Sequence, residues 1–461
     1  MTSPFTITDD DDDDDDDGNI GKDEELTTVN RASKLLQPIK VYPKGSSIKN
    51  DGLSKSHRLM LDMGIIRQAN TGLYTLLPLG NRVLEKLISI VDYQLSNIGA
   101  QKINLPNLTN ANLWAKTGRL KTMIPEIFQV KDRHGASYIL GPTHEEAITD
   151  LIANIGPMQK NQLPLLLYQI SNKWRDEMKP RLGLFRSREF VMKDLYSFDL
   201  ADEEALKSYK SIDKTYKNIL DQIGIPYIVA IGDTGLMGGT MSHEYHYLSS
   251  IGEDSVLSCN SCGIHVNAIL DDKSTCRNCN QLLEKNSAIE IGHTFLLGTK
   301  YSSVLQATCH FNNNRVPLAM GCYGLGLTRI ISAAVEILST NEDLRWPKCI
   351  APYTVCVIPP KENSKEYPAT HYADKIIEML YEKDIDFLID DRIDLTIGRR
   401  MMDARRTGYP YIIVVGRTAM ESNPLFELHD INNSQQSNIS FDQLVDFFKS
   451  TNQVERIKAT G

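Results

Sequence analysis

Two arginine-containing parts of the sequence carry side chains suited to binding a nucleotide. In the first, Trp174–Glu177 (WRDE) precedes a polar, basic loop and the stretch Arg186–Phe190 (RSREF). Guanidinium groups can bind phosphate oxygens through two parallel hydrogen bonds, and an aromatic ring can stack on a base. The sequence has no G-x-x-x-x-G-K-[ST] loop, so these residues are the candidates for binding a nucleoside triphosphate. Taken alone, a basic loop of this kind is more often a solvated surface.

The second part is the glycine-rich stretch Gly321–Arg329 (GCYGLGLTR), which leads into apolar residues. Its glycines do not follow the order G-x-G-x-x-G of dinucleotide-binding loops. They would instead let a strand pass close to a ligand before a helix begins, with Arg329 at the junction facing that ligand. For Cys322 in this strand, a place in the ligand pocket and a place in the core fit the sequence equally well.

Four of the eight cysteines form two C-x-x-C pairs, Cys259/Cys262 and Cys276/Cys279, thirteen residues apart. This spacing is typical of a structural zinc site with four thiolates, which leaves no open position for catalysis. The alternative is a redox-active or relict pair without metal. The other cysteines are scattered singly, which does not resemble a secreted disulfide framework and favours a reducing compartment.

The elements that must position these residues can be inferred from apolar spacing. Apolar residues at helical spacing predict helices over residues 80–95 and 203–223. Short apolar runs between polar turns predict strands within 165–200 and 286–320. Helices followed by clusters of strands favour an antiparallel α+β domain.

The pattern changes after Pro347. Apolar runs at 353–358, 387–389 and 411–415 alternate with helices predicted at 372–382 and 397–406. This alternation predicts a small three-layer α/β domain with parallel strands. We place the boundary between the two domains at 346–352.

The composition is that of an ordinary globular protein, with 41% hydrophobic residues and no apolar stretch long enough to span a membrane. The net charge is −9, and the unbroken run Asp9–Asp17 accounts for it, so the rest of the chain is nearly neutral. This excludes a strongly basic nucleic-acid binder, although not a local basic face. We expect residues 1–40 to be disordered, because the acidic run repels itself; an acidic docking tail is the alternative.

Three segments, in order along the chain, resemble the motifs of the class II aminoacyl-tRNA synthetases. Residues 99–106 (GAQKINLP) resemble motif 1, the dimer-interface element, with Ala100 where many members carry an aromatic residue. Residues 175–190 resemble motif 2 (R-x-E, a loop, then R-x-x-x-F), and residues 324–329 resemble motif 3 (G-x-G-x-x-R). Three motifs in the right order are far more specific than any one of them.

Further segments resemble the prolyl members of this class. Residues 141–146 (GPTHEE) are similar to their T-x-E loop, 238–244 (GGTMSHE) to their S-H-E segment, and 185–194 to their form of motif 2. Residues 390–392 (DDR) match the start of their anticodon-binding domain. The resemblance runs from about Ser54 to the C-terminus and is greatest to the mitochondrial members.

The resemblance implies a fold, an activity and partners. The fold is an α+β catalytic domain with an antiparallel sheet at 41–346, containing a cysteine ribbon at 255–285, followed by a small α/β anticodon-binding domain at 352–461. The activity is activation of proline with ATP and Mg²⁺ and transfer of the prolyl group to tRNA(Pro), in mitochondrial translation. A homodimer and no membrane partner are implied. The implied compartment is the mitochondrial matrix, although the N-terminus lacks a basic transit peptide; the cytoplasm is the alternative.

The resemblance also implies roles for single residues. Arg175 and Arg329 would be catalytic, clamping the α- and γ-phosphates of ATP, and Phe190 would stack on adenine. The implied ATP-binding set is Arg175, Glu177, Arg186, Phe190 and Arg329, and the implied proline-binding set is Thr143, Glu145, Ser242 and His243. Glu177 would contact either the adenine edge or the proline side of the pocket. No side-chain nucleophile is needed, because the carboxylate of proline attacks the α-phosphorus.

Three alternatives bear on this interpretation. A non-catalytic relative would have lost the charged residues that contact ATP, and all of them are present. Another amino-acid substrate is disfavoured by the T-x-E and S-H-E segments. An inserted editing domain is not expected, because the interval Asp199–Met320 spans 122 residues that other elements already fill.

Overall fold

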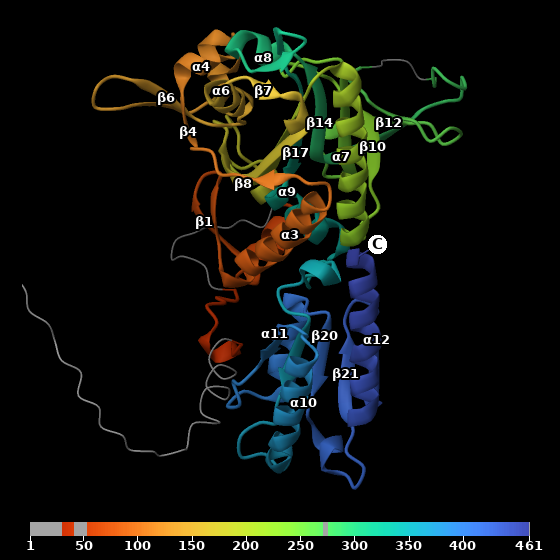
Figure 1. Ribbon diagram of the computed structural model, residues 1–461. Helices are drawn as coiled ribbons and strands as arrows, with labels where there is room; N and C mark the ends of the chain where they lie inside the picture. Colours follow the sequence, from red (N-terminus) through yellow and green to blue (C-terminus); the bar gives the residue numbers. More distant parts are fainter. Residues whose placement is uncertain (1–29, 41–52, 271–274, 461) are drawn as a thin grey trace, which may run out of the picture.

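The computed structural model describes residues 30–40, 53–270 and 275–460, and Figure 1 shows two bodies joined end to end. The larger body contains residues from 53 to about 346, and the smaller body contains those after about 354. In the parts of the chain described, no helix has the length and apolar character needed to cross a membrane.

Long strands with alternating side chains build the sheet of the larger body. Within the described residues this sheet has nine strands in the order β11-β10-β13-β12-β14-β17-β9-β8-β3. Their bounds are β3 (Gln101–Lys102), β8 (Leu165–Trp174), β9 (Glu189–Asp199), β10 (Ile228–Ile231), β11 (Met241–Leu248), β12 (Asp254–Ser258), β13 (His265–Asn267), β14 (Glu284–Gly298) and β17 (Ala319–Gly326). Neighbours among β8, β9, β17 and β14 are antiparallel, with Leu167, Tyr196, Cys322 and Phe295 in one row across them. The expected antiparallel α+β class is confirmed.

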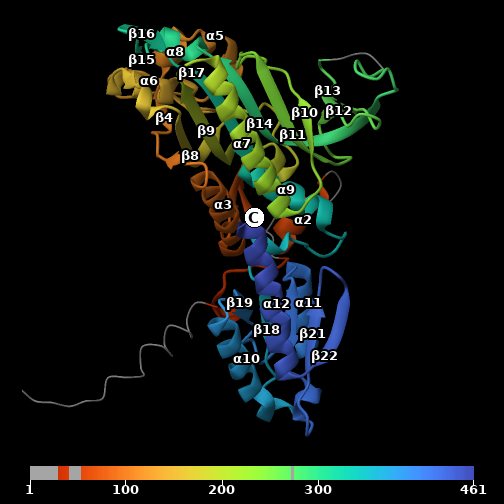
Figure 2. The same cartoon turned by 45° about the vertical axis from the view of Figure 1, so that its right-hand side comes forward.

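Helices cover both faces of this sheet. On one face, α2 (Lys55–Asp62), α3 (Pro78–Ser96), α7 (Asp202–Ile223) and α9 (Leu327–Leu338) share an apolar core with Tyr245 and Tyr323. On the other face, α6 (Glu145–Ile155) and α8 (Lys300–Leu305) pack near Phe295 and Cys322. Figure 2 shows α7 lying along the sheet. Helices α3 and α7 lie within two residues of their predicted ranges, because their buried apolar residues recur at helical spacing.

Short strands surround the large sheet. β1 (Ile66–Asn70) pairs with β2 (Leu73–Leu76); β6 (Ser137–Leu140) lies between β4 (Leu108–Asn110) and β5 (Gln129–Lys131); β15 (Thr308–Phe311) lies between β7 (Met158–Gln159) and β16 (Asn314–Pro317). Helices α4 (Ala111–Lys116) and α5 (Arg119–Met123) follow β4. The sequence did not predict these elements individually, since so few residues show little periodicity.

The smaller body has three layers. Among its described residues, five strands form a sheet in the order β19 (Phe387–Ile389), β18 (Val355–Ile358), β20 (Tyr411–Val414), β21 (Phe426–Asp430) and β22 (Gln435–Ile439). α10 (Thr370–Glu382) and α12 (Phe441–Thr460) cover one face, and α11 (Ile397–Thr407) covers the other. The predicted layers are present, but the prediction of parallel strands holds for β19, β18 and β20 alone, because β21 and β22 are antiparallel.

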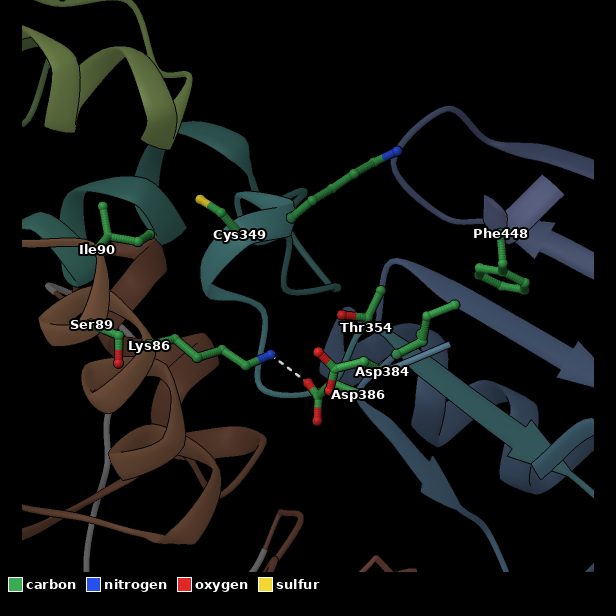
Figure 3. A pocket seen from close by; sticks show the side chains of 10 residues that line it. Lys86, Ser89, Ile90, Cys349, Thr354, Asp384, Asp386 and Phe448 are labelled. Carbon is green, nitrogen blue, oxygen red and sulfur yellow. Dashed lines mark hydrogen bonds and ion pairs between the residues drawn. The ribbon is translucent and has the colours of Figure 1, made fainter. Parts of the chain in front are cut away.

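A continuous apolar core crosses the junction between the two bodies. It extends from α3 and α9 through Trp346 and Ile350 to Tyr409 and residues of α11. The indole Nε1 of Trp346 donates to the carbonyl of Thr407 at 2.9 Å. Beside this core lies a pocket of about 300 Å³, in which Lys86 of α3 points at Asp386 just before β19 (Figure 3). The two bodies are therefore joined by both apolar and ionic contacts.

The segment 30–40 packs against both bodies, and Lys40 N–H donates to the Asp62 carbonyl of the larger body at 2.7 Å. The Oγ and backbone N–H of Ser33 donate to the two carboxylate oxygens of Asp391 at 2.7 and 2.8 Å, and Arg31 forms a parallel bridge with Ile389. This corrects the expectation of disorder through residue 40, because the edge of β19 and the Asp391 carboxylate give this segment partners. The acidic run Asp9–Asp17 lies outside the described residues.

Candidate active site

A pocket of about 380 Å³ opens on the face of the large sheet that carries Phe295 and Cys322, opposite α7. The sheet positions its floor, because alternate residues of β9 and β17 point to this face while their neighbours enter the core. Gly324 and Gly326 of β17 line the pocket, as expected for glycines beneath a ligand. The predicted residues that line it are Thr143, Glu145, Arg175, Glu177, Arg186, Phe190 and Arg329. Ser242 and His243 do not.

Two guanidinium groups line this pocket. Arg329 lies in the first turn of α9, where its Nη1 donates to the Glu290 carbonyl at 2.9 Å and its Nε to the Phe185 carbonyl at 3.2 Å. The Arg175 guanidinium lies over the Phe190 ring, 5.2 Å from its centroid. Burial, and next the charge of Arg329, lower the pKa of Arg175. Within the described chain neither guanidinium pairs closely with a carboxylate, so together they form a site for an anion.

The loop between β8 and β9 carries an ion-paired arginine. Nε of Arg186 donates to Oε2 of Glu177 at 2.7 Å, and its Nη1 donates to Oε2 of Glu253 at 3.1 Å. Arg186 and Glu177 border both the main pocket and an adjoining one of about 200 Å³, which Arg175 and Arg329 also line. Glu177 therefore lies beside the anion site.

The same pocket is also lined by a fully buried carboxylate. Glu145 is 0% exposed at the first residue of α6. The Thr143 hydroxyl lies 2.7 Å from both of its oxygens, Nη1 of Arg119 donates to Oε2 at 3.0 Å, and the Cys322 thiol donates to Oε1 at 2.9 Å. A desolvated carboxylate of this kind is suited to binding a cationic amine.

The two predicted residues on β11 point to opposite faces of the sheet. Oγ of Ser242 lies 2.6 Å from Nε2 of His293, which lines the pocket, so Ser242 supports the site through that ring. His243 turns the other way, where its Nδ1 lies 2.8 Å from the hydroxyl of Tyr209 on α7. The expectation that His243 shapes the pocket is corrected, because adjacent residues of a strand alternate between faces.

Sequence reasoning missed several charged residues of the site. Arg119 and Glu146 are buried beside Glu145, and Nη1 of Arg119 lies 3.0 Å from an oxygen of each carboxylate. Glu290 lies between His293 and Arg329. Burial alone would raise the pKa of Glu290. A hydrogen bond with His293 and the nearby positive charges outweigh burial and lower the pKa of Glu290 to about 2. The available signal for Glu290 and His293 was the presence of two ionisable residues within an otherwise largely apolar strand.

The four paired cysteines form a separate cluster. Their Sγ atoms all lie within 4.8 Å of one another, with Cys259–Cys279 at 3.3 Å and Cys262–Cys276 at 3.5 Å. The same turn closes each pair: Gly263 N–H donates to the Cys259 carbonyl and Asn280 N–H to the Cys276 carbonyl, both at 2.9 Å. A tetrahedral zinc with Zn–S bonds of about 2.3 Å needs sulfurs about 3.8 Å apart, so the cluster fits this metal.

Comparison with known proteins identifies the family. Residues 128–338 match the class II tRNA synthetase core domain (G, H, P, S and T), and residues 354–451 match an anticodon binding domain. A Rattus norvegicus protein named probable mitochondrial proline–tRNA ligase is 44% identical over 90% of this chain and 86% of its own length. The chain belongs to the proline–tRNA ligase family.

Other members of the proline–tRNA ligase family match over similar spans. The probable mitochondrial enzyme of Schizosaccharomyces pombe is 38% identical over 82% of this chain and 89% of its own length, and the enzyme of Ehrlichia chaffeensis is 34% identical over 86% and 95%. The same fold is found in a crystal structure of prolyl-tRNA synthetase from Cryptosporidium parvum complexed with halofuginone and AMPPNP. The TM-score is 0.71 at 17% sequence identity, and the match covers 88% of this chain and 79% of that chain. The predicted fold and family are confirmed.

Proposed function

We propose that this chain activates L-proline with ATP and transfers the prolyl group to the 3′ end of tRNA(Pro). The observation that carries this proposal is the pairing, in one pocket, of the buried Glu145 carboxylate with the guanidinium groups of Arg175 and Arg329. The buried carboxylate is suited to binding an amine, and the two guanidinium groups are suited to binding phosphates. An amino acid and a nucleotide bound there would meet between the two ends.

The residues of the pocket suggest how the first step proceeds. The secondary ammonium of proline donates to Glu145 and to the Thr143 hydroxyl, which leaves its carboxylate directed towards the arginines. Arg175 binds the α-phosphate and Arg329 the γ-phosphate of ATP. The proline carboxylate then attacks the α-phosphorus and pyrophosphate leaves. Alignment and preorganised positive charge lower the barrier, with no nucleophile from the protein.

The nucleotide end is completed by three further groups. Phe190 stacks on adenine, and Glu177 accepts a hydrogen bond from the adenine edge, an assignment supported by its place beside the arginines rather than beside Glu145. Arg186 would leave one of its carboxylate partners to reach a phosphate. Glu290 is the pocket carboxylate that we assign to hold Mg²⁺, which would neutralise negative charge on the phosphates.

The remaining assignments follow from the relatives and from the two bodies. We assign 41–346 as the catalytic domain, with a zinc ribbon at 255–285 held by Cys259, Cys262, Cys276 and Cys279, and 352–461 as the anticodon-binding domain. Bound zinc would cross-link the two turns of the ribbon. A homodimer acting in the mitochondrial matrix is supported by the resemblance of residues 99–106 to motif 1 and by the mitochondrial relatives.

The test is ATP–pyrophosphate exchange with purified protein and each of the twenty amino acids. We expect strong exchange with proline and charging of tRNA(Pro) in the presence of that amino acid. Exchange that depends on a different amino acid would refute the assignment of the amine end of the pocket. The absence of exchange with every amino acid would refute the proposal that this chain is an enzyme that activates amino acids.

A further inference from the structure

One guanidinium serves two buried carboxylates beside the amine end of the pocket. Nη1 of Arg119 lies 3.0 Å from Oε2 of Glu145 and 3.0 Å from Oε2 of Glu146. All three side chains are buried, at 3%, 0% and 0% exposure. With all three ionised, the cluster carries one uncompensated negative charge in a site that water does not reach. Such a charge is costly unless a cation joins it.

Packing contacts hold Arg119 between the two carboxylates rather than against Glu145 alone. Its guanidinium packs over the Trp114 ring at 4.5 Å, and its Nη2 contacts the Met237 sulfur at 3.3 Å. Glu146 is held in turn by the Thr117 hydroxyl, which donates to Oε1 at 2.8 Å. Glu146 therefore competes for the positive charge that would otherwise neutralise Glu145.

The other titratable groups near this cluster do not supply the missing charge. Lys300 is exposed on α8 and donates to the carbonyls of Leu236 and Met237, both at 2.9 Å, so water screens its charge. Tyr301 and Cys322 are neutral, since burial raises the pKa of each. His144 is buried with its pKa lowered to about 4, which keeps the ring neutral at pH 7. Nearby Lys173 is already paired with Asp194 at 2.8 Å.

We propose that Arg119 and Glu146 are positioning residues that leave the amine subsite one positive charge short, so that this subsite selects the charge of the proline ammonium as well as the shape of its ring. The inference rests on the proposed function. Glu145 and Thr143 contact the amine, while Glu146 acts through Arg119 without contacting the substrate. Binding of proline completes the charge balance of the cluster.

The test compares proline with tetrahydrofuran-2-carboxylate, which has the same ring size and carboxylate but no ammonium. In Glu146→Gln the cluster is neutral before the substrate binds. We expect the KM for proline in pyrophosphate exchange to rise at least tenfold, while the inhibition constant of the uncharged analogue stays the same or falls. The KM for ATP should change less than threefold.

Controls separate charge from packing. Thr117→Val removes a hydrogen bond to Glu146 but no charge, and should keep the KM for proline within threefold of wild type. Glu146→Asp restores the charge and should recover part of the loss. If Glu146→Gln weakens proline and the analogue by the same factor, or leaves the KM for proline unchanged, the proposal is wrong. Failure of the proposed function would differ, because wild-type protein itself would then show no exchange with proline.

Discussion

Replacing Arg175 by alanine should remove a phosphate contact without damaging the fold. Among the described residues, the Arg175 guanidinium makes no hydrogen bond or close ion pair. The like charge of Arg329 repels it, and three carboxylates attract it more weakly, those of Glu290, Glu126 and Glu177. Arg175→Ala therefore leaves no buried acceptor unpaired, and it removes the repulsion together with the weaker attractions. We expect the melting temperature to stay the same or rise slightly.

The catalytic effect of the same change should be large. Loss of one preorganised charge contact to the transition state costs about 2–3 kcal/mol, which corresponds to a fall of about 30- to 150-fold in kcat/KM. Proline-dependent pyrophosphate exchange at varied ATP concentration measures this fall in kcat/KM. Lys179→Ala is the matched control: it removes one positive charge from the same loop, but its exposed side chain lies outside the pocket. Exchange by Arg175→Ala within threefold of the Lys179→Ala control would refute our placement of ATP.

Three further predictions can be checked with the same preparation. Freshly purified protein should contain about one zinc per chain and Cys276→Ser should release it; substoichiometric metal in never-chelated protein would favour the metal-free alternative. Burial raises the pKa of Glu146, despite the opposing charge of Arg119, so Glu146 loses its negative charge as the pH falls through that pKa. The KM for proline should therefore rise at low pH in wild type, and it should depend less on pH in Glu146→Gln. The chain should form some alanyl-adenylate, because a proline pocket cannot fully exclude the smaller alanine. It should not hydrolyse preformed Ala-tRNA(Pro), and deacylation above the rate without enzyme would reveal an editing site.

The sequence predicted the parts of the structure that depend on local pattern. Helices α3 and α7 show long apolar periodicity, and Arg175 and Arg329 stand in short motifs whose spacing is itself the signal. The antiparallel strands β21 and β22 were missed. β22 is an exposed edge strand rich in polar residues and lacks apolar alternation, and β21 has five residues of which three are polar or charged.

The parts of the site that depend on side-chain direction or distant contacts could not be predicted. Which face of β11 meets the pocket depends on strand register, so Ser242 and His243 could not be separated. Arg119 meets Glu145 from 26 positions away, and nothing in its own neighbourhood indicates that contact. Sequence motifs found the pocket residues Arg175 and Arg329, whereas the buried charges around Glu145 required the fold.

The core that crosses the junction has a thermodynamic consequence. Because Trp346, Tyr409 and the apolar face of α11 share one cluster with α3 and α9, neither body can lose its packing without exposing apolar surface on the other. The chain should therefore melt as one cooperative unit rather than as two independent ones, and a fragment ending near residue 346 should be poorly soluble. A destabilising change in α11, far from the pocket, should then reduce amino-acid activation by lowering the folded fraction of the whole chain.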